Sequence, residues 1–258
     1  MDTAMYISDD GILLSAVLEK PEGRRNPPLA ILLHGFTSAK DRPHTLAAAE
    51  AMREAGCATL RFDLYGHGES GGEFRKHTLY KWIGNTLAVI DYARELGYTE
   101  IYLSGHSQGG LVAALVGGMA PDRIRGLILR APAFMIPQGA REGSLLGYSF
   151  DPEHIPEKIP ALGGLILDGN YICVAQMIHA EDAADRYRHP VLILHGDEDD
   201  TVPAEDSARM AERYRNCALA VIAGETHHFD RYPEKMKEII RNWLMKQTGA
   251  LCAERKQP

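Results

Sequence analysis

The stretch Ile101-Tyr102-Leu103-Ser104-Gly105-His106-Ser107-Gln108-Gly109-Gly110 decides how this chain folds. β-Forming residues lead into Gly-x-Ser-x-Gly, and apolar and small residues with helical spacing follow, which predicts a strand, a sharp turn and a helix. Glycines two before and two after Ser107 relieve the crowding of such a turn, so the hydroxyl is exposed beside the N-terminus of the helix. Ser107 is therefore a candidate nucleophile. The alternative is a glycine-rich turn with a capping serine.

Strands and helices alternate along the rest of the chain. Apolar runs typical of strands buried on both faces occur at residues 29–33, 57–62, 124–129 and 191–194. Two short N-terminal segments, 5–8 and 13–19, flank Asp9-Asp10-Gly11 and predict antiparallel edge strands. We therefore expect an α/β fold, a mostly parallel, doubly wound sheet with helices on both faces. The active site of such a sheet lies beyond the carboxyl ends of its strands.

One long segment interrupts this alternation. Nearly sixty residues separate Pro132 from Pro190, many more than a simple connection needs. We expect residues 133–187 to form a small inserted α/β cap over the active site. The alternative is a surface excursion unrelated to the substrate. The remaining chain is then divided into a core of residues 1–132 and 188–250 and a flexible tail of residues 251–258.

The local pattern of the inserted segment predicts its elements. Residues 147–150 and 165–172 are typical of short strands, with a tight turn at Asp168-Gly169. Residues 174–187 have the spacing of one helix.

The composition excludes several classes of partner. The formal net charge is −7 and the only basic cluster is Arg24-Arg25, so we expect no nucleic-acid partner. No run approaches about 18 apolar residues, which predicts no membrane span. The N-terminus lacks the basic and apolar regions of a secretory signal, so we expect a cytoplasmic protein, although a chain trimmed of its signal would look the same. The four cysteines have neither metal-site nor disulfide-framework spacing, and we interpret them as free thiols: Cys57, Cys173, Cys217 and Cys252.

A serine nucleophile needs a base and an acid that orients the base, and both follow predicted strands. For the base, the loop Gly224-Glu225-Thr226-His227-His228 offers two histidines. We favour His227 over His228, since it stands three residues after the glycine. For the acid, the loop after residues 191–194 contains Asp199, which we favour, with Asp197 and Asp200 as alternatives. Some of these acids are also explained as a solvated cluster near a helix N-terminus.

An oxyanion hole needs two N–H donors. One is the N–H of Gln108, directly after the nucleophile, and the other is expected from a loop after an earlier strand. His34-Gly35-Phe36 is such a loop, in which the glycine lets the Phe36 N–H face Ser107 while the phenyl ring lines the acyl pocket. We interpret the remaining histidines beside these motifs as structural: His34, His67 and His106.

The set of motifs resembles the α/β-hydrolase superfamily, in which Ser, Asp and His follow in this chain order. The resemblance covers nearly the whole chain. The motifs are similar to those of bacterial cinnamoyl (feruloyl) esterases, namely His34-Gly35-Phe36-Thr37, Arg61-Phe62-Asp63 with Gly66-His67-Gly68, Gly105-His106-Ser107-Gln108-Gly109-Gly110, Ala131-Pro132-Ala133 and His154-Ile155-Pro156. That subfamily carries a small inserted cap and hydrolyses esters of hydroxycinnamic acids. The resemblance implies that Tyr171 faces the aromatic ring of the acyl group.

The expected function is that of a serine carboxylesterase acting on hydroxycinnamic acid esters through an acyl-enzyme. Its partner is a small-molecule ester, and neither a cofactor nor a metal is implied. One alternative is an esterase or monoacylglycerol-type lipase for short or medium aliphatic acyl esters, which a rather apolar cap would suit. Another is a non-catalytic ligand-binding protein of the same fold. Serine rather than aspartate at position 107 disfavours dehalogenase chemistry. The cap could equally serve the pairing of two protomers into a homodimer.

Overall fold

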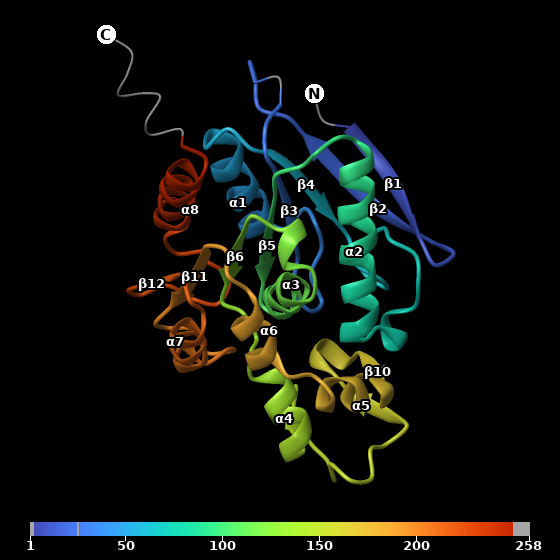
Figure 1. Ribbon diagram of the computed structural model, residues 1–258. Coiled ribbons are helices and arrows are strands. Elements are labelled where there is room, and N and C mark those ends of the chain that lie inside the picture. Colours follow the sequence, from blue (N-terminus) through green and yellow to red (C-terminus); the bar gives the residue numbers. More distant parts are fainter. Residues whose placement is uncertain (1–2, 25, 250–258) are drawn as a thin grey trace.

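A central sheet of eight strands organises the molecule, for which a computed structural model describes residues 3–24 and 26–249 (Figure 1). The strand order is β1-β2-β4-β3-β5-β6-β11-β12. The sheet strands are β1 (Thr3–Asp9), β2 (Ile12–Glu19), β3 (Leu29–Leu33), β4 (Ala58–Phe62), β5 (Ile101–His106), β6 (Gly126–Arg130), β11 (Val191–Gly196) and β12 (Cys217–Ile222). The pairs β1·β2 and β2·β4 are antiparallel and all others are parallel. The predicted mostly parallel sheet is confirmed.

Helices cover both faces of the sheet, as expected for a doubly wound fold (Figure 1). The main helices are α1 (Pro43–Glu54), α2 (Leu79–Glu95), α3 (Gln108–Met119), α7 (Ala204–Arg213) and α8 (Pro233–Gln247), with the 3-10 turns η1 (Phe74–Lys76) and η2 (Pro121–Arg123). Helices α1 and α8 pack together on one face, while α2 and α3 lie on the other. Because buried strands alternate their side chains between faces, the sheet has two separate apolar cores.

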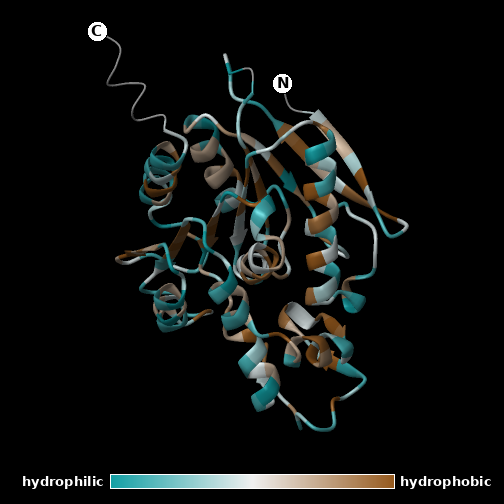
Figure 2. Cartoon of the chain, viewed as in Figure 1, coloured by the Kyte–Doolittle hydropathy of each residue, from teal (hydrophilic) through white to brown (hydrophobic). Residues whose placement is uncertain are grey.

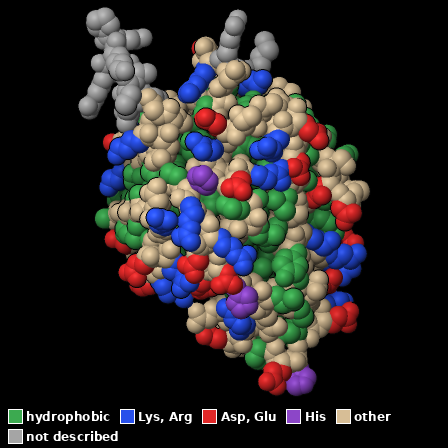
Figure 3. All heavy atoms as spheres, in the orientation of Figure 1, with side chains coloured by type: hydrophobic (Ala, Val, Ile, Leu, Met, Phe, Trp, Pro, Cys, Tyr) green, Lys and Arg blue, Asp and Glu red, His purple; other side chains and the backbone are tan. Residues whose placement is uncertain are grey.

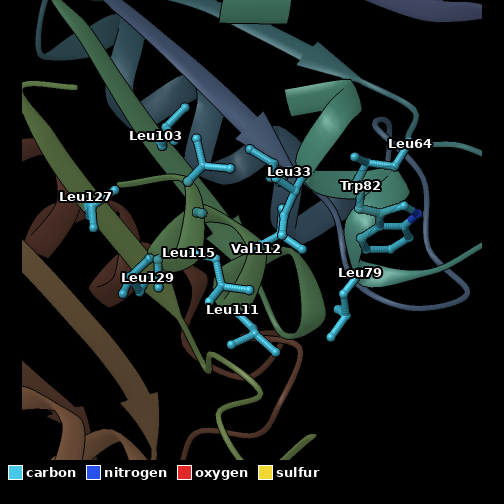
Figure 4. Close-up of a cluster of buried hydrophobic side chains, with 14 of the residues drawn as sticks. Leu33, Leu64, Leu79, Trp82, Leu103, Leu111, Val112, Leu115, Leu127 and Leu129 are labelled. Carbon is cyan, nitrogen blue, oxygen red and sulfur yellow. The ribbon is translucent and has the colours of Figure 1, made fainter. Parts of the chain in front are cut away.

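The larger core lies between the sheet and helices α2 and α3, and Figure 4 shows part of it. Leucines of β3, β5 and β6 meet apolar side chains of α2 and α3 there, among them Leu33, Leu103, Leu129, Leu111 and Trp82. Figure 2 shows the corresponding pattern along the chain, with hydrophobic strands at the centre and hydrophilic residues on the outer sides of the helices. Helix α3 is buried almost throughout, so its first turn and the strand end before it are held rigidly.

Residues 133–187 lie between β6 and β11 and carry short elements of their own (Figure 1). These are α4 (Ile136–Glu142), β7 (Ser144–Leu145), β8 (Tyr148–Ser149), β9 (Lys158–Pro160), η3 (Leu162–Gly164), β10 (Ile166–Asp168), α5 (Asn170–Gln176) and α6 (Ala180–Arg186). Strand β10 pairs with β9, and β7 pairs with β8.

Two local predictions for this segment are wrong. The Asp168-Gly169 pair does not close a hairpin, because β10 takes its partner from upstream and α5 begins at Asn170. A Cβ at residue 169 would come within 2.0 Å of the carbonyl oxygen of Pro156, so this glycine permits a close approach of two chain segments. The helix predicted for 174–187 is instead α5 and α6, separated at Met177–His179.

The surface mixes acidic and basic side chains over the face that Figure 3 shows. Within residues 3–24 and 26–249, no helix is long and apolar enough to cross a membrane. Cys57, Cys173 and Cys217 are free thiols, as predicted, whereas Cys252 and the tail 251–258 lie outside the described residues.

Candidate active site

Ser107 occupies a strained turn between β5 and α3. Its backbone has φ 54° and ψ −123°, a conformation that costs about 1–3 kcal/mol for a residue with a Cβ. The neighbouring glycines make the turn possible, since a Cβ at residue 105 would lie 2.1 Å from the carbonyl oxygen of Gly109, and one at residue 109 would lie 2.2 Å from that of His34. The Ser107 N–H donates to the Arg130 carbonyl at 3.0 Å, which ties the turn to β6.

His227 and Asp199 come together from two loops at the carboxyl end of the sheet. The Nδ1–H of His227 donates to Oδ2 of Asp199 at 2.7 Å, and both side chains are buried. The main-chain oxygen of His227 accepts a 2.8 Å hydrogen bond from Nε2 of His106. This imidazole is therefore held through its ring and its backbone, with Nε2 left as the nitrogen that can exchange a proton.

Asp199 is held as an anion. Its Oδ1 accepts 2.9 Å bonds from the N–H groups of Thr201 and Val202. His195, at the end of β11, places Nε2 3.1 Å from Oδ2. Burial alone would raise the pKa of Asp199, but hydrogen bonds from His195 and His227 outweigh it and keep that pKa well below its usual range.

The alternatives to these two residues lie elsewhere. Asp197 accepts a 2.6 Å bond from the Gly224 N–H, and Asp200 accepts from Thr201 Oγ1. His228 is exposed and its ring centroid lies 5.2 Å from that of His227. Neither acid has a hydrogen bond to His227 within the described part of the chain. Sequence reasoning missed His195, although its position four residues before Asp199 at a strand end was a usable signal.

The loop His34-Gly35-Phe36 lies directly against Ser107. A Cβ at residue 35 would stand 3.1 Å from the Ser107 Cβ. The Phe36 N–H has no acceptor among the described residues, and the Gln108 N–H, in the first turn of α3, has no carbonyl four residues back in the helix. Two backbone donors of this kind beside a nucleophile could stabilise an oxyanion.

Two histidines hold that loop in place. The His34 ring accepts from the Leu64 N–H at 3.0 Å through Nε2 and donates from Nδ1 to the Gly35 carbonyl at 2.8 Å. The His67 ring accepts from the Thr37 N–H at 3.3 Å and donates to the Tyr65 carbonyl. Burial lowers the pKa of His34 to about 3, so it is neutral and keeps an acceptor nitrogen for these bonds.

An aromatic wall, consisting of Phe36, Phe74, His77 and Tyr171, stands beside this loop. The Tyr171 hydroxyl donates to Oε1 of Gln108 at 2.7 Å, although the two residues are 63 positions apart. Its ring centroid lies 5.3 Å from that of His77 and 6.5 Å from that of Phe36. Tyr171 belongs to α5, so the inserted segment contacts a residue of the nucleophile turn directly.

No group of three or more His, Cys, Asp or Glu side chains in residues 3–24 and 26–249 could hold a metal ion. A strained serine, a histidine oriented by a carboxylate and two N–H donors can together perform nucleophilic acyl transfer.

Comparison with known proteins places this geometry in a family. A family model described as serine aminopeptidase, S33 matches residues 27–151. Est1E from Butyrivibrio proteoclasticus, in a structure with ferulic acid bound, is 48% identical with a TM-score of 0.93, covering 95% of this chain and 100% of that chain. A second structure of Est1E is 46% identical with a TM-score of 0.90, covering 95% of this chain and 99% of that one.

Curated relatives are more distant. The human mitochondrial palmitoyl-protein thioesterase ABHD10 is 27% identical over 220 residues, which is 81% of this chain and 68% of that protein. The dihydrolipoyllysine-residue acetyltransferase component of the acetoin cleaving system of Pseudomonas putida is 26% identical, and the match spans 74% of this chain but only 56% of that protein's length. The likeness to Est1E extends over the sheet, the nucleophile turn and the inserted segment alike. The chain belongs to the serine esterases of the α/β-hydrolase superfamily.

Proposed function

We propose that this esterase hydrolyses esters of hydroxycinnamic acids. The observation that carries the proposal is its likeness over 95% of the chain to a structure that holds ferulic acid, a hydroxycinnamic acid. The aromatic wall supports it, because a planar aromatic acyl group gains from contact with ring faces and edges. The wall stands next to the proposed oxyanion donors, where the acyl carbonyl of a bound ester has to lie.

In the proposed mechanism, the Oγ of Ser107 attacks the acyl carbonyl carbon and its proton passes to Nε2 of His227. Asp199 holds the imidazole and stabilises the imidazolium that forms. The N–H groups of Phe36 and Gln108 stabilise the oxyanion, each typically worth roughly 3 kcal/mol, and the N-terminus of α3 adds a favourable dipole. The alcohol leaves with the proton from His227. Water, deprotonated by His227, then attacks the acyl-enzyme and releases the carboxylic acid and free Ser107.

Residues 133–187 are proposed to act as the cap on the acyl side, with residues 1–132 and 188–250 as the core. Two contacts support this division. Tyr171 bonds to Gln108, and Arg75 of η1 pairs with Asp168 of β10 through oxygens at 2.7 and 3.0 Å. Pairing of two protomers through the cap and a cytoplasmic location stay predictions from the sequence.

Acyl preference tests the proposal. We would measure kcat/KM for methyl ferulate and methyl p-coumarate beside methyl butyrate and methyl octanoate, so that the alcohol is constant. We expect the hydroxycinnamates to win by tenfold or more, about 1.4 kcal/mol of differential transition-state binding. If the aliphatic esters win, the protein is an aliphatic-ester hydrolase and Tyr171 has another role.

Ser107→Ala serves as the control for every substrate. It should abolish turnover while leaving the fold intact, as judged by circular dichroism. A serine-reactive fluorophosphonate should label the wild-type protein and not this variant. Absence of labelling in the wild type, together with binding of ferulate, would favour a non-catalytic ligand-binding protein.

A further inference from the structure

His195 is a buried imidazole that the proposed mechanism does not use. It stands at the carboxyl end of β11, fully buried, four residues before Asp199. Its Nδ1 lies 2.7 Å from Oγ of Ser207 in α7, and its Nε2 lies 3.0 Å from the main-chain oxygen of Val202. Helix α7 packs against β11 (Figure 1). His195 therefore links the strand, the loop and the helix that surround Asp199.

The contacts of His195 determine which of its ring nitrogens carries the proton. Nε2 faces two oxygens that can only accept, the Val202 carbonyl at 3.0 Å and the ionised Oδ2 of Asp199 at 3.1 Å. Both oxygens would repel a lone pair on Nε2, so this nitrogen is the N–H donor. Nδ1 then accepts from the hydroxyl of Ser207, which is fully buried. Ser207 thus selects the tautomer of His195 that can donate toward the carboxylate.

The carboxylate of Asp199 is thereby held at both oxygens. Oδ1 accepts from the N–H groups of Thr201 and Val202, each at 2.9 Å, and Oδ2 accepts from Nδ1 of His227 at 2.7 Å. Val202 closes a small network, since its N–H donates to Asp199 and its carbonyl accepts from His195. The last torsion of an aspartate side chain is soft, so these contacts fix the direction in which Oδ2 faces the base.

The contact from His195 also supplies partners to groups that have few others. The Asp199 side chain is fully buried, and no lysine or arginine among the described residues pairs with it. Imidazoles and main-chain N–H groups therefore balance its negative charge. Without the N–H of His195, both Oδ2 and the Val202 carbonyl would lose a partner inside the protein, which is unfavourable for a buried carboxylate.

We infer that His195 is a positioning residue for ester hydrolysis: its Nε2–H holds the Asp199 carboxylate toward His227, and Ser207 selects the tautomer that makes this possible. The inference rests on the proposed roles of Asp199 and His227 and adds two residues that act through them. Because His195 acts through the acid and the base rather than on the substrate, its loss should lower kcat and leave KM nearly unchanged.

Two variants at position 195 separate the hydrogen bond from packing. His195→Leu fills the site without a donor, whereas the amide of His195→Gln can still donate toward Asp199 and Val202. With methyl ferulate we expect kcat to fall about 30-fold in His195→Leu, in line with one lost hydrogen bond to a charged group, and less than about five-fold in His195→Gln. Equal losses of kcat in the two variants, an unchanged kcat in His195→Leu, or a loss that appears in KM instead would overturn the inference. Circular dichroism checks that both variants are folded.

Ser207→Ala keeps the imidazole of His195, so it tests the choice of tautomer even if His195→Leu does not fold. NMR of 15N-labelled histidine shows which ring nitrogen carries the proton, and His195→Gln assigns the signal by its disappearance. We expect the wild-type ring to be protonated at Nε2 alone at neutral pH. Ser207→Ala should populate the Nδ1–H form and lower kcat about three-fold. A wild-type ring protonated at Nδ1, an unaltered tautomer in Ser207→Ala, or an altered tautomer without a fall in kcat would contradict the inference.

Thr59→Val is the matched control for Ser207→Ala. Thr59 is also fully buried, its hydroxyl accepts from Arg53 at 3.4 Å, and it lies near the amino end of β4, away from the site. We expect kcat and the His195 tautomer to be unchanged in this variant, and an equal loss of kcat would show a general effect of removing a buried hydroxyl. Failure of the proposed function is a separate result. It would appear as turnover that survives Ser107→Ala, whereas the tautomer of His195 is measured without any substrate.

Discussion

The two sides of Ser107 differ in how they are built. On the cap side, four rings form a wall, and the Tyr171 hydroxyl is bonded to Gln108. On the side of α1, an open cavity is lined by polar groups that have no partners, with Arg42 at its rim. The buried Nε2 of His77 in the wall also lacks a partner among the described residues, so hydrogen bonding does not separate the two sides. They differ in shape and charge, because the wall presents aromatic rings, whereas the cavity is lined by polar side chains and has Arg42 at its rim. The two sides of Ser107 therefore offer a substrate different surfaces, aromatic on one side and polar on the other.

Changes at the shared centre should lower activity without altering the acyl preference. Asp199→Asn removes the carboxylate that orients His227, and loss of the orienting carboxylate in such a triad costs about 10⁴-fold in turnover. We expect this loss with methyl ferulate and methyl butyrate alike. Asp200→Asn is the matched control, since that exposed side chain bonds, among the residues that the structure describes, only to Thr201. A similar loss in Asp200→Asn, with Asp199→Asn active, would transfer the role to the alternative acid.

Both sides depend on neutral, buried imidazoles, so stability should fall in acid. Burial lowers the pKa of His77 on the aromatic side to about 3 and that of His44 on the cavity side to about 2, both from 6.5. The unfolded chain therefore binds more protons than the folded one below pH 6.5, and stability is lost as the pH falls from there toward the folded pKa. Each such group contributes up to about 1.4 kcal/mol per pH unit.

Urea unfolding between pH 7.5 and 5 checks this dependence. His77→Asn keeps a donor for the Phe74 carbonyl and should reduce the slope of unfolding free energy against pH by about one proton. His44→Asn, on the cavity side, should reduce this slope by a similar amount. An unchanged slope in both variants would mean that carboxylates, rather than these imidazoles, cause the loss of stability in acid.

A change on the cap side should alter the acyl preference without a large loss of activity. We expect its effect to be the smallest of those predicted. Tyr171→Phe keeps the ring but removes the bond to Gln108, so we expect the preference for methyl ferulate over methyl butyrate to fall about five-fold, in line with one lost buried hydrogen bond. Tyr187→Phe is the matched control, because Tyr187 is also buried and donates at 3.1 Å to Ile124, away from the site. An equal change in both variants would show a general loss of stability.

Much of the core could be predicted because its signals are local. The turn at Ser107 follows from glycines at positions where any Cβ would collide with backbone within 2.2 Å. Candidates for the acid and base could be found because parallel strands bring their carboxyl ends to one edge of the sheet. The inserted segment was predicted less well: β10 pairs with β9 and α5 begins at Asn170, since pairing there depends on the approach of Pro156 to Gly169 rather than on the turn residues.

The sequence by itself determined the order of strands and helices, the strained turn at Ser107 and the loops that carry the proposed base, acid and two N–H donors, because periodicity and turn chemistry act over a few residues. Only the tertiary structure decided which acid meets His227, that His195 also contacts Asp199, and that Tyr171 bonds to Gln108. It also decided that Arg130 is buried with unpartnered nitrogens behind His44. Such contacts join segments far apart in the chain, and their geometry is set by packing that no local pattern records.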